Sequence, residues 1–438
     1  MDYGVIAAVT IFVLTYALII SERIDRSTVA MAGAAAMVLF GIVFNFYTQE
    51  EVISAINWNT IGLLLGMMLI VGILEETGLF EALAVYAAKA SRGNYYYMIV
   101  LFSVLTAIGS MTIDNVTTVL LVAPVSLRIC DDLGVDPKPV LLMEATFANI
   151  GGVATLVGDP PNIIIGSAAH LTYLDFLYNL MPVVLLSMAL TLIFFRYYLS
   201  DTIEEANEQI RQRTTENSIL DHSPSEQVKN WSLLYRSLGI LAIVTVGFGL
   251  QSITGLEPAT VALIGASVLL LIANQDMEEM VSRVEWTTLL FFAGLFVVVN
   301  GIAKTGVLTA VASEIASLST SHYSASIIVL IISGIGSGIV DNIPFTAAMI
   351  PVIHSMNTQL SLHGDELWWA LAMGAGFGGN ATYIGSSATV VAVKISERHG
   401  DAITFRYWLR YGTVIMLVTI LTGLLDLTVR FLVLPSIT

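Results

Sequence analysis

The chain has 438 residues, of which 56% are hydrophobic and only 12% are charged. Apolar runs of about 20 residues recur along its whole length, as helices that cross a bilayer require. The net charge of −16 argues against nucleic acids and anionic lipids as partners. The single cysteine, Cys130, excludes an internal disulfide, and the six histidines lack paired metal-ligand spacing. Composition therefore predicts an all-α polytopic membrane protein.

The first half of the sequence begins with apolar runs that predict three spans and a short interfacial helix. The first run has neither the basic flank nor the cleavage site of a secretory signal, so we expect it to be retained as a span. The predicted elements are the spans at about Tyr3 to Ile20, Thr28 to Phe46 and Trp58 to Leu74, and the interfacial helix from Phe80 to Ala90.

Two apolar arms follow, from 95 to 108 and from 116 to 129, and they meet at Asp114-Asn115. Residues 140–169 then predict a helix that must break, because Pro160 and Pro161 remove backbone donors while nearby glycines allow unwinding. An ionisable residue, Asp159, lies at this break. In lipid, unwound backbone is tolerated only where it is buried in protein or lines a watery cavity. A last span, from about Leu174 to Tyr197, completes the first half at residue 198.

Residues 199–232 are rich in acids and poor in large apolar side chains, which predicts a solvated cytoplasmic linker. The second half, 233–438, then repeats the order of the first. We expect spans at about 233–250, 258–273, 286–303 and 411–434, an interfacial helix near 308–318, a hairpin over 323–358 with Asp341-Asn342 at its tip, and a broken helix over 367–395.

Gap-free alignment supports this internal repeat. At a shift of 227, Gly151-Gly152 falls on Gly378-Gly379, and Asp114-Asn115 falls on Asp341-Asn342. Trp58 and Gly78 fall on Trp286 and Gly306 at 228, and Thr28-Val29-Ala30 falls on Thr260-Val261-Ala262 at 232. Broken helices at matching positions of two halves are a sequence signal for a transporter's binding site.

The basic residues distinguish two topologies for the arm pairs. If both pairs are re-entrant hairpins and the loop of Arg23 and Arg26 is cytoplasmic, all but two of the 18 Lys and Arg residues lie inside. The exceptions are Lys304 and Arg430; if both pairs cross instead, the residues divide evenly. Because cytoplasmic loops carry the basic excess, we predict two inverted repeats, 1–198 and 233–438. Each has five membrane crossings, one of them a broken helix, plus one re-entrant hairpin, which gives ten crossings with both termini outside.

Carboxylates inside a membrane usually serve an ion path or a proton relay. Asp114, Asp159 and Asp341 all lie at breaks with no Lys or Arg nearby in sequence, so we expect cations as their partners. The oxygens there suit sodium, with Asp114, Asn115, Asp159, Asp341 and Asn342 as expected ligands. Helix N-termini at the breaks can equally hold an anion. The full set of candidate ion or substrate-binding residues is Asp114, Asn115, Thr117, Thr155, Gly158, Asp159, Asn162, Asp341, Asn342, Gly379, Asn380, Thr382, Ser386 and Ser387.

The runs SMTIDNVTTVLLVAPV (110–125), NIGGVATLVGDPPNIIIGS (149–167) and GFGGNATYIGSSATVV (376–391) resemble the ion transporter superfamily. They are most similar to its branch of arsenite-efflux permeases, sodium/proton antiporters and the pink-eyed-dilution P protein, often described as citrate-transporter-like. The resemblance implies a homodimer, elevator-type alternating access, and ion or substrate sites at both tips and in the Gly158-Asp159 and Gly379 to Ser387 loops. The dicarboxylate carriers have Ser-Asn-Thr at the tips, whereas this chain has Asp-Asn-Val and Asp-Asn-Ile.

Together these observations predict a secondary active transporter of the plasma membrane, with sodium/proton antiport as the expected activity. An anion permease for arsenite, citrate or another small carboxylate, coupled to protons or sodium, is the alternative. We expect no enzyme activity and no cofactor beyond sodium ions or protons. An intramembrane aspartyl protease needs Tyr-Asp and Gly-x-Gly-Asp sequences, and neither Asp114 nor Asp341 follows a tyrosine. A channel built on the same scaffold is a further alternative, and transport that saturates with ion concentration would argue against it.

Overall fold

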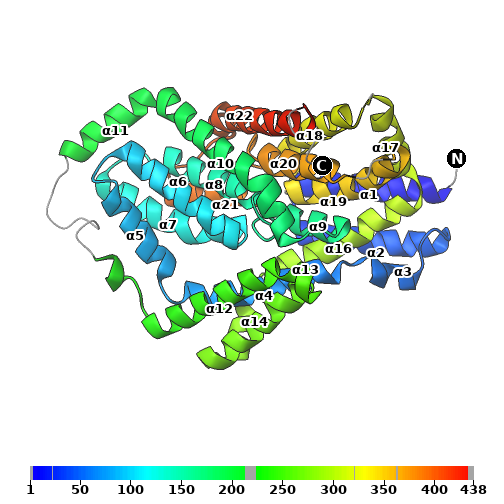
Figure 1. Cartoon of the computed structure of the whole chain (residues 1–438), viewed down its shortest axis with the longest axis horizontal. Coiled ribbons are helices and arrows are strands. Elements are labelled where there is room, and N and C mark those ends of the chain that lie inside the picture. The colour runs from blue at the N-terminus through cyan, green and yellow to red at the C-terminus, as the bar shows by residue number, and fades with distance from the viewer. Residues whose placement is uncertain (1–2, 22, 213–222, 320, 362–363, 433–438) are drawn as a thin grey trace.

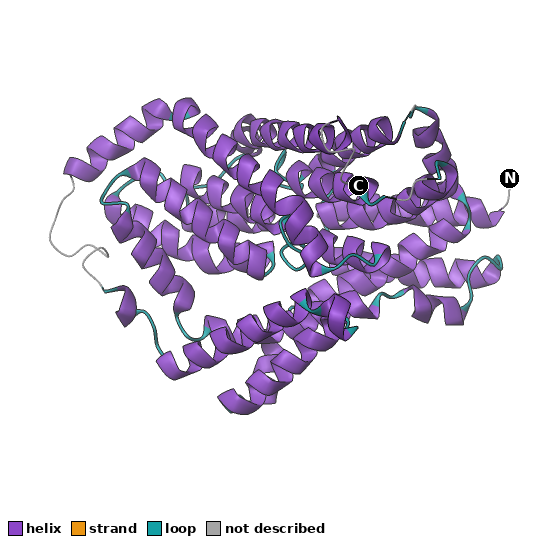
Figure 2. Cartoon of the chain, in the orientation of Figure 1, coloured by secondary structure: helices purple, strands orange, loops and turns teal. Residues whose placement is uncertain are grey.

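The structure is a computed structural model that describes residues 3–21, 23–212, 223–319, 321–361 and 364–432. These residues form helices and loops without any strand (Figure 2). Nine of the described helices are long and apolar enough to cross a membrane. The prediction of an all-α polytopic membrane protein is therefore confirmed.

The first half contains α1 to α10, and the second half contains α12 to α22 (Figure 1). The first ten are α1 Tyr3–Ser21, α2 Arg26–Val43, α3 Gln49–Ala55, α4 Trp58–Glu75, α5 Leu79–Ala90, α6 Tyr95–Thr112, α7 Asn115–Leu133, α8 Lys138–Gly152, α9 Pro160–Ala169 and α10 Tyr173–Tyr198. The others are α12 Trp231–Gly249, α13 Gln251–Thr254, α14 Pro258–Ala273, α15 Met277–Arg283, α16 Trp286–Lys304, α17 Val307–Ser317, α18 His322–Ile339, α19 Asn342–Gln359, α20 Glu366–Gly378, α21 Ser387–His399 and α22 Phe405–Leu432.

Both predicted helix breaks are present. The helix over 140–169 divides into α8 and α9 around an unwound segment that ends at Asp159, and the one over 367–395 divides into α20 and α21. The hairpin arms α6 and α7 extend about four residues past the predicted ends at 108 and 129. Asp114 and Asp341 explain where the second arms begin, because each side chain caps the helix that follows it.

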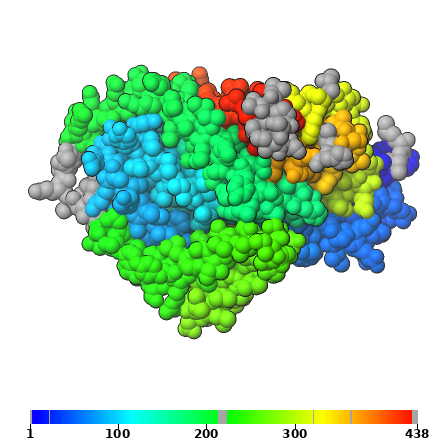
Figure 3. All heavy atoms as spheres, viewed as in Figure 1, coloured from blue at the N-terminus to red at the C-terminus, as the bar shows by residue number. Residues whose placement is uncertain are grey.

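The two halves interlock through their early helices: α2 packs against α16, and α4 packs against α14. Glycine makes both crossings close, since a Cβ on Gly294 would lie 2.7 Å from the Ala30 backbone and one on Gly66 would lie 2.7 Å from that of Ala262. These two crossings are equivalent under the internal repeat. Beneath the rest of the molecule, α12 and α14 form a projecting ridge (Figure 3). Exposed apolar side chains such as Tyr235, Ile243 and Leu271 cover it, as suits a surface facing lipid or another subunit.

Each first hairpin arm packs against the helix that leads into the break of its own half, α6 against α8 and α18 against α20. The hydrogen bonds repeat as well. Ser110 Oγ donates to the Ala148 carbonyl at 2.6 Å, and its counterpart Ser337 donates to the Ala375 carbonyl at 2.6 Å. The repeat detected in the sequence is therefore also a repeat of atomic contacts; the number of crossings and their inverted orientation stay predictions.

The segment predicted as a solvated linker contacts the first half where it is described. Helix α11 (Ser200–Gln212) buries Ile203, Ala206 and Ile210, and the Asn207 side chain accepts a hydrogen bond from the Tyr95 amide at 2.8 Å. Farther along, the Lys229 amide donates to the Thr77 carbonyl at 2.8 Å. The pattern of Ile203, Ala206 and Ile210 at helical spacing was a sequence signal for this amphipathic helix. The middle of the linker, 213–222, lies outside the described residues.

The α6–α8 contact provides a test of close helix packing. A Cβ on Gly151 would lie 2.5 Å from the Ala107 carbonyl oxygen, a backbone atom that cannot yield. We expect Gly151→Ala to lower the free energy of unfolding by about 1–3 kcal/mol, measured by thermal unfolding in detergent. Gly239→Ala is the matched control, because nothing lies within 4 Å of a Cβ there. It should be neutral or stabilising, and equal melting temperatures for the two variants would contradict the close contact.

Candidate functional site

The centre of the candidate site is Asp159, which is 1% exposed. It ends the unwound segment in extended backbone (φ −142°, ψ 132°) and begins α9, but its side chain makes no capping hydrogen bond. The carboxylate instead accepts hydrogen bonds from the two hairpin tips: Asn115 Nδ2 lies 3.1 Å from Oδ1, and Asn342 Nδ2 lies 3.1 Å from Oδ2. Residues from both halves thus meet at one carboxylate.

The unwound backbone around Asp159 is satisfied by short polar side chains. Asn162 Nδ2 lies within 3.1 Å of the carbonyl oxygens of Gly152, Val153 and Thr155. The Thr155 hydroxyl donates to the Met111 carbonyl at 2.7 Å and accepts from the Gly158 amide. These bonds supply the partners that a break in an apolar interior requires. Thr155, Gly158 and Asn162 therefore hold the loop, and none of the three donates one of these hydrogen bonds to the Asp159 carboxylate.

The second break is held in the same way. Thr382, the counterpart of Thr155, donates to the Gly338 carbonyl at 2.7 Å. Close backbone approach explains the glycines, because a Cβ on Gly379 would lie 2.9 Å from the Gly385 oxygen and one on Gly158 would lie 2.7 Å from the Gly152 oxygen. These glycines shape the loops by allowing backbone to touch backbone.

Asn149 connects the two breaks and was missed by the sequence analysis. It is fully buried on α8, and its Oδ1 accepts from Asn115 Nδ2 at 3.0 Å and from the Ser386 hydroxyl at 2.9 Å. Its Nδ2 donates to Asn380 Oδ1 at 2.9 Å. The available signal was a lone amide in the apolar run 145–153. Two of its partners, Asn380 and Ser386, are more than 200 positions away and gave no local sign.

Two of the predicted carboxylates lie to either side of this centre. Asp114 is used within its own helix, where it accepts from the Thr117 amide at 2.8 Å and from the Thr117 hydroxyl at 2.6 Å. Asp341 accepts from the Ile343 amide at 3.0 Å and from the Ser387 hydroxyl at 2.8 Å. Both act on Asp159 electrostatically, but neither shares a hydrogen bond with it among the described residues.

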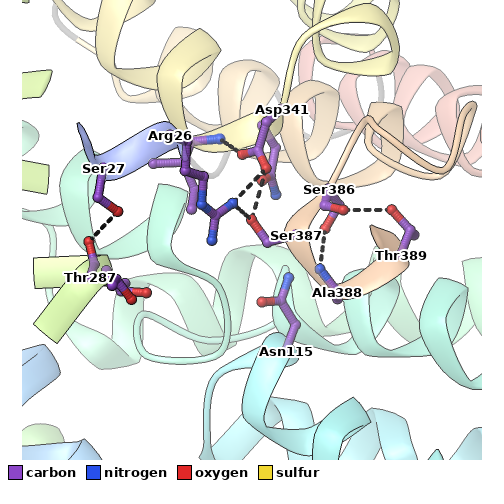
Figure 4. A network of polar contacts seen from close by, with 12 residues as sticks. Arg26, Ser27, Asn115, Thr287, Asp341, Ser386, Ser387, Ala388 and Thr389 are labelled. Atoms are coloured by element: carbon purple, nitrogen blue, oxygen red, sulfur yellow. Dashed lines mark hydrogen bonds and ion pairs between the residues drawn. The ribbon is translucent and has the colours of Figure 1, made fainter. Parts of the chain in front are cut away.

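The expected cationic partner of Asp341 is a basic side chain that is distant in sequence. Arg26, which begins α2, lies 3.3 Å from Asp341 Oδ2 and also donates to the Ser387 hydroxyl (Figure 4). The basic partner comes from 315 positions earlier in the chain, so proximity in sequence could not indicate it. Asp159 and Asp114 have no such ion pair in the part of the chain that the structure describes.

Oxygen and amide groups dominate the site, which limits the metals that it could hold. Within the described residues there is no group of three His, Cys, Asp or Glu side chains arranged for a metal ion. Asn115 Oδ1 is buried without a hydrogen-bond partner, as is Asn380 Nδ2. Which end of an amide is oxygen is assigned from hydrogen bonding, so rotation of Asn115 would turn a carbonyl oxygen toward Asp159. A carboxylate with amide oxygens beside it is a donor set that suits a hard monovalent cation.

Asn149 provides a test of the connection between the breaks. We expect Asn149→Ala to abolish transport and to destabilise the fold by about 1–3 kcal/mol, because it leaves Asn380 Oδ1 without a donor and removes an acceptor from Asn115 Nδ2 and from the Ser386 hydroxyl. Asn300→Ala is the matched control, since the side-chain oxygen of Asn300, Oδ1, already lacks a hydrogen-bond partner. Transport at the wild-type rate in Asn149→Ala would show that the amide contacts have no functional role.

Comparisons with known proteins agree with this architecture. Residues 16–374 match the family model described as "Citrate transporter". The chain is 41% identical to the uncharacterized transporter Rv2684 of Mycobacterium tuberculosis, covering 98% of this chain and 99% of that protein. It is 33% identical to the human P protein, covering 99% of this chain and 61% of that longer protein.

Among solved structures, the YdaH transporter of Alcanivorax borkumensis is similar in fold, with a TM-score of 0.56 over 98% of both chains at 16% identity. Its structure is described as having an unusual topology. The match with the family model spans most of the sequence and includes the first tip, the first break and the second tip. The chain therefore belongs to the citrate transporter family of membrane transporters, within the ion transporter superfamily.

Proposed function

We propose that this transporter exchanges sodium ions for protons at Asp159. The observation that carries the proposal is a buried carboxylate held only by the Asn115 and Asn342 amides, with no basic side chain paired to it among the described residues. A charge buried in this way is costly unless a counter-ion neutralises it. Either a proton or a sodium ion can do so, and a site that accepts one at a time exchanges them.

The geometry also supports alternating access. Asp159 lies where two tips and two unwound loops meet, so movement of the hairpins with their breaks would carry the bound ion as a unit. We therefore propose elevator-type transport by a homodimer in the plasma membrane, with cytoplasmic linker and external termini. Asn115 and Asn342 are the proposed sodium ligands beside Asp159, with Asp114 contributing negative potential.

Proton movement in proteoliposomes that contain a pH dye tests this proposal. Adding sodium should release protons in the wild type, and Asp159→Asn should reduce the signal to that of empty liposomes, because an amide cannot exchange a proton for a cation. Asp276→Asn is the matched control: this exposed side chain caps α15, and asparagine caps helices equally well. It should keep the wild-type rate. A flat response from correctly inserted wild-type protein would rule out sodium/proton antiport.

An anion permease is the second candidate, and one cavity favours it. A cavity of about 310 Å³ lies beside the second tip, and its lining includes Arg26, Lys394 and Ser387. Two basic side chains and a hydroxyl can hold a small carboxylate or oxyanion. Asp25 and Asp341 line the same cavity, which offsets this positive charge. Uptake of labelled citrate or arsenite without sodium-driven proton movement would select this function over antiport.

A further inference from the structure

The contacts of Arg26 differ from those of an ordinary surface ion pair. Its guanidinium bonds to Asp341 and to the Ser387 hydroxyl, which itself donates to Asp341 Oδ2 at 2.8 Å. The guanidinium carbon also lies 5.4 Å from the centre of the Phe291 ring. The Asp341 side chain is only 12% exposed. The charge of Arg26 is thus fixed against a hairpin tip by groups from α16, α21 and the tip itself (Figure 4).

The internal repeat shows that this arrangement exists in only one half. Asp341 corresponds to Asp114 at the shift of 227, but Arg26 corresponds to Pro258 at the shift of 232. Proline has no charge to offer, and Asp114 makes no ion pair where the chain is described. Glu285 lies within electrostatic reach of both Asp114 and Arg26. The first tip is therefore a carboxylate without a tethered cation, and the second tip is a carboxylate with one.

Two cavities, one beside each half's break, also differ in their basic side chains. The 310 Å³ cavity is lined by Asp25, Arg26, Val390 and Lys394, and a second cavity of about 110 Å³ is lined by their counterparts Glu257, Pro258, Ile163 and Ser167. The cavities correspond at these four positions, although Asp341 lines the first and its counterpart Asp114 is not in the lining of the second. The first has two basic side chains, whereas the lining of the second, within the described residues, has neither Lys nor Arg. In the cavity beside Asp341, the two basic side chains offset the charges of Asp25 and Asp341, so that no mobile cation is required to balance them.

We propose that Arg26 is a tethered cation that fills the cation position at the second tip, so that each chain has one exchangeable position, at Asp159, on which Asp114 of the first tip acts electrostatically. This inference rests on the proposed function, in which the exchangeable position is at Asp159. Arg26 determines the stoichiometry because its guanidinium neutralises Asp341 permanently, and no mobile ion is then needed there. A lysine should act in the same way, since it supplies the same charge.

Equilibrium binding of radiolabelled sodium to the purified full chain tests the inference. The wild type should bind one sodium ion per chain. Arg26→Gln leaves Asp341 and Ser387 as an unneutralised oxygen site beside an open cavity, so its stoichiometry should rise to two. Arg26→Lys should bind one. The Hill coefficient of sodium-driven proton movement should rise above one in Arg26→Gln alone.

The double variant Arg26→Gln with Asp341→Asn controls for folding, because it removes both charges and leaves no unpaired ion. It should bind one sodium ion, and binding of none would overturn the inference. One sodium ion in Arg26→Gln, or two in the wild type, would also overturn it while leaving antiport intact. No binding in the wild type with one ion in Arg26→Gln would support the tethered cation but refute sodium exchange at Asp159. No binding in either protein would refute both.

Discussion

The structure depends on satisfying unwound backbone inside an apolar interior. Two helices break where lipid or protein offers no water, and every freed carbonyl and amide there must find a partner. Asn162, Thr155 and Thr382 supply these partners, and glycines let the loops lie against the hairpin arms. Because each hairpin is required to complete the loop of its own half, the tips are placed at the breaks. The same requirement brings Asn115 and Asn342 to Asp159.

The breaks were predictable from sequence because their causes are local. Two prolines after Asp159 and glycine pairs before each break disfavour a continuous helix whatever surrounds them. The ends of α6 and α7 were less accurate, because helix ends depend on capping and on tertiary packing. The linker helix α11 was not predicted, since its apolar stripe of Ile203, Ala206 and Ile210 is short and acidic residues dominate the segment.

Contacts between the halves could not be predicted in the same way. Asn149 bonds to the first tip and to the second unwound loop, and Arg26 bonds to a carboxylate 315 positions away. A single sequence gives the residue types but not which distant positions meet. The lack of a basic neighbour in sequence was therefore weak evidence about the partners of Asp341. Asp114 differs, because its carboxylate is used by Thr117 only three residues on, so this contact is local.

The internal repeat accounts for the similar backbone of the two halves, and the few positions at which their side chains differ account for the charges of the site. The counterpart of Asp159 at the shift of 227 is Ser386, so only one of two equivalent loops carries a carboxylate at its break. Ser386 instead donates to Asn149, which bonds to the first tip. At the shift of 232, the counterpart of Arg26 is Pro258. Thus the first half supplies both the negative charge at the centre and the fixed positive charge beside the second tip, while the second half supplies a hydroxyl at the centre. Two halves with the same backbone then form a single polar centre, because their side chains differ at these few positions.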